Sequence, residues 1–176
     1  MCIRDRYYDV YFDSQNKINP SYNPIDYIEE QIYKLDVDFF RDSPNHLNLN
    51  YRGQWRCYNV VFIWDEQNKI ISVSSHFDIT KKEKINKNIY SLVSIVNEKI
   101  NLGYFHYCSK LDTVFFKYHV SVKGLDYLTE EQINDILNVV IHECDKYFPA
   151  LYLFFFKKQD PKFALSASLI ETNGRA

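Results

Sequence analysis

The sequence predicts an α+β fold, with a single antiparallel sheet built from two hairpins and helices packed on it. Three observations predict this class. Several segments alternate apolar and polar residues with a period of two and are joined by short polar turns, which is typical of antiparallel strands. Other segments carry apolar residues at helical spacing and begin at capping residues. The chain has 176 residues, the usual length of one domain.

The domain is expected to begin at residue 23. The opening letters MCIRDR look like an adapter-derived translation at the start of a reading frame assembled from environmental DNA, and residues 7–22 are polar and rich in Asn. We therefore interpret residues 1–22 as a non-native or flexible lead, and residues 23–176 as the folded domain.

The first element is expected to be a helix. Asn23 is a favoured N-cap, and Pro24 fits the first helical position because its missing N–H needs no partner there. Apolar residues at helical spacing form one face, at Ile25, Ile28, Ile32 and Leu35. The period then changes to two over residues 47–51, which predicts a strand.

Two hairpins are expected in the middle of the chain. Residues 55–64 and 70–78 are largely apolar and alternating, and the polar connection DEQNK joins them. Residues 104–109 and 113–122 repeat this arrangement around a short turn. These four segments are the strands of the predicted sheet.

Two longer helices are predicted around the second hairpin. Residues 81–102 carry an apolar stripe at 100° per residue, and Gly103 is well placed to end that helix. Residues 129–148 begin with Thr129 and Gln132, which have the spacing of a capping box. Both helices are amphipathic, so each has one face to bury.

The end of the chain is expected to contain a strand and a short helix. Pro149 is predicted to end the preceding helix, and the apolar run LYLFFF at residues 151–156 is predicted to be a strand. Asp160 and Pro161 have the pattern of an N-cap followed by a first helical residue. The final helix would have a face of small residues, at Ala164, Ala167 and Ser168.

The adjacent residues His142, Glu143 and Cys144 do not form an active site in this prediction. Successive helical residues are rotated by 100°, so the three side chains point in different directions. Cys144 lies in the apolar stripe and is expected to be buried, whereas His142 is expected to face solvent. A helical zinc pair would need a histidine four residues after His142, where the chain has Lys146.

The spacing of the cysteines argues against a zinc-binding protein. The four cysteines lie far apart, at Cys2, Cys57, Cys108 and Cys144, which is not a zinc pattern. Reduced thiols in a cytoplasmic protein are the simpler interpretation, and a disulfide pair stays open.

The net charge is −2 with no basic stripe, so no nucleic-acid partner is expected. No run reaches the roughly 18 apolar residues of a membrane span, so no membrane association is expected.

The order of these segments resembles the YbjN family. The residues that carry the resemblance are NPIDYIEE, GQWRCYNVVFIWDE, VNEKINLGYFHY, HECDKYFPALYLFFF and ETNGRA, between Asn23 and Ala176. The version looks like that of alphaproteobacteria. The resemblance implies a bacterial sensory transduction regulator with a fold similar to type III secretion chaperones. The chain departs from the family at Lys157 and Lys158, where glycines are expected, and at Lys117, where arginine is expected.

The leading hypothesis is a non-enzymatic, chaperone-like module that binds a protein partner. It follows from the resemblance and from an excess of aromatic residues, 15 Tyr and 13 Phe. The candidate partner-binding residues are Trp55, Tyr58, Phe62 and Trp64. The alternative, that all four are core residues, stays open.

Two other functions compete with it. A small metal-dependent enzyme is conceivable if the strand histidines His76, His106 and His119 approach one another, with Glu98 or Asp78 as a further ligand. A purely structural homodimer is the third hypothesis. The sequence predicts no catalytic residue, metal or cofactor for the leading hypothesis.

Overall fold

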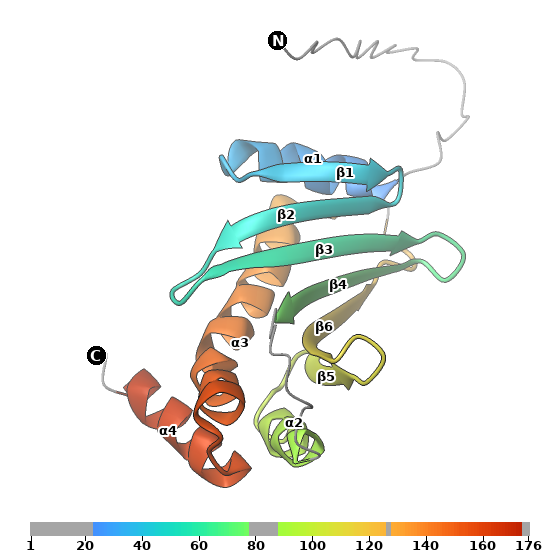
Figure 1. Ribbon diagram of the computed structural model, residues 1–176. Coiled ribbons are helices and arrows are strands. Elements are labelled where there is room, and N and C mark those ends of the chain that lie inside the picture. Colours follow the sequence, from blue (N-terminus) through green and yellow to red (C-terminus); the bar gives the residue numbers. More distant parts are fainter. Residues whose placement is uncertain (1–22, 78–87, 126–127, 174–176) are drawn as a thin grey trace, which may run out of the picture.

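The computed structural model describes residues 23–77, 88–125 and 128–173, and it has one six-stranded antiparallel sheet with four helices (Figure 1). The strands lie in the order β1-β2-β3-β4-β6-β5. The predicted α+β class and single antiparallel sheet are therefore confirmed. The strand bounds are β1 Phe39–Ser43, β2 His46–Arg52, β3 Cys57–Asp65, β4 Ile70–Phe77, β5 Tyr104–Cys108 and β6 Thr113–Ser121.

Both predicted hairpins are present in the sheet. Strands β3 and β4 form the first hairpin and β5 and β6 form the second, and β4 pairs with β6 to join them. Strands β1 and β2 extend the sheet on the other side of β3. The sequence did not single out β1, because its residues FFRDS do not alternate cleanly and it lies at the edge of the sheet.

Helices cover one face of the sheet, and the core lies between them and the strands. On β3, alternate side chains from Tyr58 to Trp64 are buried, and those between them are partly exposed. The helices are α1 Pro24–Lys34, α2 Ile89–Asn97, α3 Glu130–Lys157 and α4 Pro161–Asn173, and α3 crosses behind the strands in Figure 1. Within the described ranges, no helix has the length and apolar character needed to cross a membrane.

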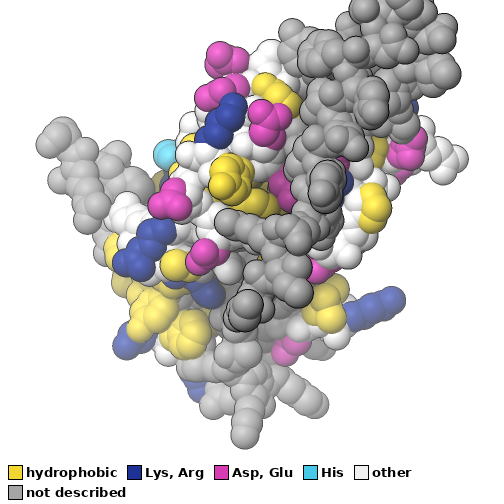
Figure 2. All heavy atoms as spheres, turned by 90° about the horizontal axis from the view of Figure 1, so that it is seen from above, with side chains coloured by type: hydrophobic (Ala, Val, Ile, Leu, Met, Phe, Trp, Pro, Cys, Tyr) yellow, Lys and Arg dark blue, Asp and Glu magenta, His cyan; other side chains and the backbone are white. Residues whose placement is uncertain are grey.

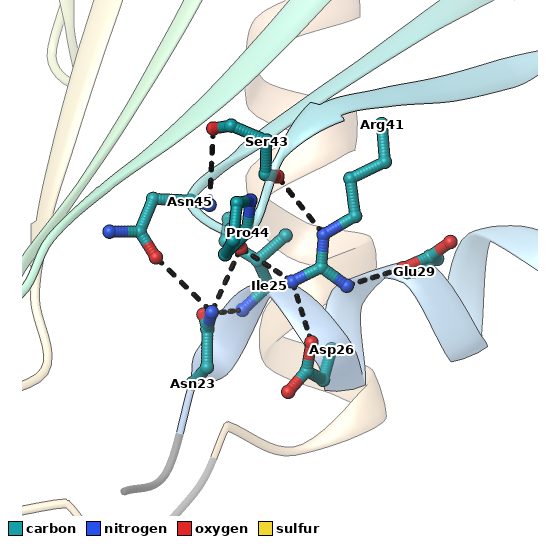
Figure 3. A network of polar contacts seen from close by, with 8 residues as sticks. All are labelled: Asn23, Ile25, Asp26, Glu29, Arg41, Ser43, Pro44 and Asn45. Atoms are coloured by element: carbon teal, nitrogen blue, oxygen red, sulfur yellow. Dashed lines mark hydrogen bonds and ion pairs between the residues drawn. The ribbon is translucent and has the colours of Figure 1, made fainter. Parts of the chain in front are cut away.

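The predicted start of α1 is confirmed. The Asn23 side chain accepts a 2.9 Å hydrogen bond from the N–H of Ile25 and donates one of 2.8 Å to the carbonyl of Pro44 (Figure 3). Asn23 therefore caps the helix and ties it to the turn between β1 and β2.

Arg41 on β1 strengthens this junction from the other side. Its guanidinium forms ion pairs of 2.6 Å with both Asp26 and Glu29 of α1, and it also donates to the carbonyls of Ser43 and Pro44 (Figure 3). The planar guanidinium has enough donors to satisfy four acceptors at once. The edge strand β1 is thus attached to α1 as well as to β2.

Helix α2 is shorter than predicted. It ends at Asn97 rather than beside Gly103, and residues 81–87 of the predicted helix lie outside the described residues. The Asn97 side chain accepts a 2.8 Å hydrogen bond from the N–H of Phe105 and donates one of 3.0 Å to its carbonyl. These bonds fasten the end of α2 to β5. Gly103 instead takes a positive φ of 79° just before β5.

Helix α3 is longer than predicted, and the predicted strand at residues 151–156 is wrong. The helix passes through Pro149 and ends at Lys157, and the C-cap residue Lys158 adopts the left-handed conformation. A proline inside a helix costs about 3 kcal/mol. Leu151 and Phe154 continue the buried stripe beyond the proline, and burying such side chains contributes about 1.5–3 kcal/mol each. This burial offsets the cost, so the helix continues.

Both helix starts near the C-terminus are confirmed. Thr129 and Gln132 form the predicted capping box. Asp160 accepts a 2.9 Å hydrogen bond from the N–H of Lys162 and so caps α4. Ala164 and Ser168 are fully buried, which lets α4 lie close against α3.

Candidate functional site

Four aromatic rings form a continuous stack along one side of α3, and we call them the aromatic strip. The rings are Trp55, Phe148, Tyr152 and Phe156. Their centroids are 6.3, 6.2 and 5.1 Å apart along this order, with interplanar angles of 23°, 30° and 23°. Such offset stacks are favourable arrangements of aromatic pairs.

The aromatic strip is exposed, and it touches the core through Phe148. Trp55, Tyr152 and Phe156 are 43%, 40% and 38% exposed, and Phe148 is half-buried. Phe148 also stacks on the buried ring of Phe77, with centroids 6.5 Å apart. Exposed apolar patches of this kind are typical of interaction sites.

The helical course of α3 through Pro149 creates the strip. Phe148, Tyr152 and Phe156 are four residues apart, so they lie on one side of a continuous helix. A strand over residues 151–156 would not have continued the line that begins at Phe148. Because the sequence predicted a strand at residues 151–156, it did not reveal that Phe148, Tyr152 and Phe156 line up on one side of a helix.

Asp145 holds the remaining ring, Trp55, against α3. Its carboxylate accepts hydrogen bonds of 2.8 Å from the Tyr58 hydroxyl, 2.8 Å from the N–H of Gln54 and 3.4 Å from the N–H of Trp55. Burial raises the pKa of Tyr58, and the hydrogen bond to Asp145 raises it further. Tyr58 therefore stays a neutral donor, and the turn between β2 and β3 is fixed to the helix.

Gly53 makes room for this anchor. A Cβ atom at this position would lie 2.7 Å from a carboxylate oxygen of Asp145 and would also overlap the ring of Tyr58. Only glycine lets the turn approach the helix so closely.

Comparison with known proteins places the chain in a family. The model of the YbjN family, described as "Putative bacterial sensory transduction regulator", matches residues 24–153. The chain belongs to the YbjN family. The matched part of this YbjN domain includes Trp55, Asp145, Phe148 and Tyr152. Among the curated proteins, none matches the chain.

A solved structure shares the fold of this YbjN protein. The structure is titled "Crystal Structure of the ExsC-ExsE Complex"; the TM-score is 0.51 at 10% sequence identity, and the match covers 70% of this chain and 92% of that chain. At this identity the likeness concerns the fold alone. The predicted resemblance to type III secretion chaperones is confirmed at that level.

The structure separates the four residues that the sequence named as candidates for partner binding. Trp55 lies in the aromatic strip. Tyr58, Phe62 and Trp64 point from β3 into the core of the YbjN domain and are 1%, 0% and 5% exposed. These three side chains therefore lie in the core, as the alternative interpretation of the sequence described.

The strand histidines of the YbjN domain share the helix-free face of the sheet without converging. His76 and His106 lie on opposite sides of Phe115 in register, and His119 is four residues further along β6. His119 lies 2.9 Å from the Ser72 hydroxyl and 3.3 Å from that of Tyr104. Among the residues that the structure describes, no three His, Cys, Asp or Glu side chains could hold a metal ion. Asp78 lies outside those residues.

The adjacent residues His142, Glu143 and Cys144 point in different directions, as predicted. Cys144 is fully buried and His142 is exposed. Burial raises the pKa of the Cys144 thiol, which disfavours the thiolate that a nucleophile requires. Glu143 and His142 line a cavity of about 590 Å³ beside α3, and partial burial raises the pKa of Glu143.

Proposed function

We propose that this protein is a non-enzymatic, chaperone-like module that binds a segment of a partner protein on the aromatic strip. The observation that carries the proposal is the stack of four rings, three of which are about two-fifths exposed. Burying exposed Trp, Tyr and Phe side chains contributes strongly to protein association. Three rings of the strip come from α3, and the fourth, Trp55, comes from the turn between β2 and β3.

The rigidity of the strip supports this function. Asp145 fixes Trp55 through the backbone of its turn, and Phe77 supports Phe148 from the core. A surface that is already ordered loses little conformational entropy when it binds. The rings therefore suit recognition better than an equal number of flexible side chains would.

The comparisons support the proposal in general terms. The solved structure that shares the fold is itself a complex, of ExsC with ExsE. The YbjN family description names sensory regulation. We propose that this module takes part in such regulation by capturing and releasing a partner protein. We place this activity in the cytoplasm, where the cysteines of the module stay reduced.

A crosslinked pull-down with quantitative mass spectrometry tests the proposal. The baits are residues 7–176, the double variant Tyr152→Ser, Phe156→Ser, and a matched control, Tyr33→Ser, Leu111→Ser, at two exposed apolar residues of other elements. Lysate of an alphaproteobacterium supplies the candidate partners. We expect one protein to be recovered equally by the wild type and the control, and about tenfold less by the strip variant, since two lost anchors cost more than about 1.4 kcal/mol.

Two outcomes would contradict the proposal. Equal recovery of every protein by all three baits would remove the strip as the binding surface. Recovery of the bait alone, with light scattering that shows a dimer for the wild type and a monomer for the strip variant, would instead support the structural homodimer.

A further inference from the structure

The aromatic strip ends in a group of lysines. Lys157, Lys158 and Lys162 lie within six residues at the turn from α3 to α4, directly after Phe156. The chain as a whole has a net charge of −2, so this positive group is a local feature. Figure 2 shows hydrophobic side chains gathered with Lys and Arg around them at the lower left, the side on which α4 lies in Figure 1.

Two acidic side chains near the strip, Asp160 and Asp145, already accept hydrogen bonds within the protein. Asp160, the one acid of residues 157–162, caps α4 by accepting from the N–H groups of Lys162 and Phe163. Asp145 accepts from Tyr58 and from two backbone N–H groups of the β2–β3 turn. Lys157 and Lys162 therefore outnumber the one acid of this segment, and neither of these two lysines takes part in a described ion pair.

A positive charge lies next to the exposed apolar surface at Tyr152. The ammonium group of Lys157 lies over the ring of Tyr152, 6.0 Å from its centroid. A partner that covers Tyr152 must therefore also approach a positive charge. An acidic side chain on the partner would gain an ion pair there, and a basic one would be repelled.

We infer that the strip takes an acidic amphipathic segment of a partner protein, with apolar side chains on Tyr152 and Phe156 and Asp or Glu side chains beside Lys157 and Lys162. This inference rests on the proposed function and specifies the partner's chemistry. The rings are spaced by one helical turn, which matches the apolar stripe of an amphipathic helix. A single-stranded nucleic acid could also stack on aromatic rings, but such binders track the backbone with a strongly basic groove, whereas this chain has a net charge of −2.

Fluorescence anisotropy with designed peptides tests the inference. Two labelled peptides of about 18 residues, or five helical turns, have leucines at the same positions; one has glutamate and the other lysine at the polar positions. We expect the wild type to bind the acidic peptide about tenfold more tightly than the basic one at low salt, with the preference shrinking as salt rises. Lys157→Gln, Lys162→Gln should remove most of the preference, whereas Lys99→Gln, Lys110→Gln, at exposed lysines elsewhere, should keep it.

The outcomes separate this inference from the proposed function. Equal binding of both peptides, reduced by Tyr152→Ser, Phe156→Ser, would overturn the acidic preference and leave the strip as a binding surface. Binding of the acidic peptide that this strip variant does not reduce would overturn both. Failure of the acidic peptide to bind, or tighter binding of oligothymidylate than of the acidic peptide, would overturn the inference while the pull-down still tests the function.

Discussion

The carboxylate of Asp145, on α3, accepts a 2.8 Å hydrogen bond from the hydroxyl of Tyr58, on β3. The two residues are 87 positions apart in the chain. The bond therefore joins the N-terminal part of the sheet to the long C-terminal helix, and the same carboxylate fixes the turn that carries Trp55. The position of Trp55 in the aromatic strip therefore depends on the Asp145 side chain.

Replacing Asp145 with alanine should destabilise the protein. The Tyr58 hydroxyl would lose its acceptor, so the free energy of unfolding should fall by about 2–3 kcal/mol. Tyr58→Phe removes the donor and leaves no unpaired hydroxyl, so it should cost only about 1 kcal/mol. Urea denaturation measures both values. An Asp145→Ala variant as stable as the wild type would show that the anchor does not contribute.

Stability should fall in alkaline solution. Burial raises the pKa of Tyr147 to about 12, and it also raises that of Tyr58. An unfolded tyrosine titrates near about pH 10, so the folded state holds these protons more tightly than the unfolded state. The contribution of Tyr147 is therefore complete below about pH 10 and is lost as the pH rises through about 12, and the contribution of Tyr58 also begins to fall above about pH 10.

Denaturation midpoints over a pH series check this dependence. The decline above about pH 10 should be shallower in Tyr147→Phe and Tyr58→Phe than in the wild type, because phenylalanine has no proton to lose. A decline of the same steepness in all three proteins would mean that other groups cause it.

Pro149→Ala should stabilise α3. Alanine restores a backbone N–H inside a continuous helix and removes the clash of the proline ring with the preceding turn. We expect the free energy of unfolding to rise by about 1 kcal/mol, less than the full helix penalty because the chain has adjusted to the proline. Thermal denaturation followed by circular dichroism tests this, and a large loss of stability would argue against a helix that continues to Lys157.

Arg41→Lys should weaken the attachment of α1 to β1. A lysine keeps the positive charge, but its single ammonium cannot reach Asp26, Glu29 and two carbonyls together. The free energy of unfolding should fall by about 1–2 kcal/mol. The loss is limited because Asp26 is exposed and solvent screens its ion pair with Arg41. The matched change Arg52→Lys, at an exposed position of β2, should alter stability by less than about 0.5 kcal/mol. Similar melting temperatures for the two variants would contradict the role of Arg41.

Local chemistry made the helix starts and the hairpins readable from the sequence. Asn23 and Thr129 cap helices through bonds to residues two and three positions away, so their pattern is visible in a short window. Cys144 could be assigned to the core for the same reason, because the apolar stripe of α3 repeats within a few turns. The candidate site was less readable, since Trp55 was named while Phe148, Tyr152 and Phe156 were not.

The sequence by itself determined the α+β class, the two hairpins, the capped helix starts and the family resemblance, because each depends on residues close together in the chain. Tertiary structure decided that β1 joins the sheet, that Asn97 ends α2 against β5, and that α3 continues beyond Pro149. It also decided which aromatic residues are exposed. These outcomes depend on burial and hydrogen bonds between distant segments, whose free energies exceed the local preferences that a sequence pattern reports.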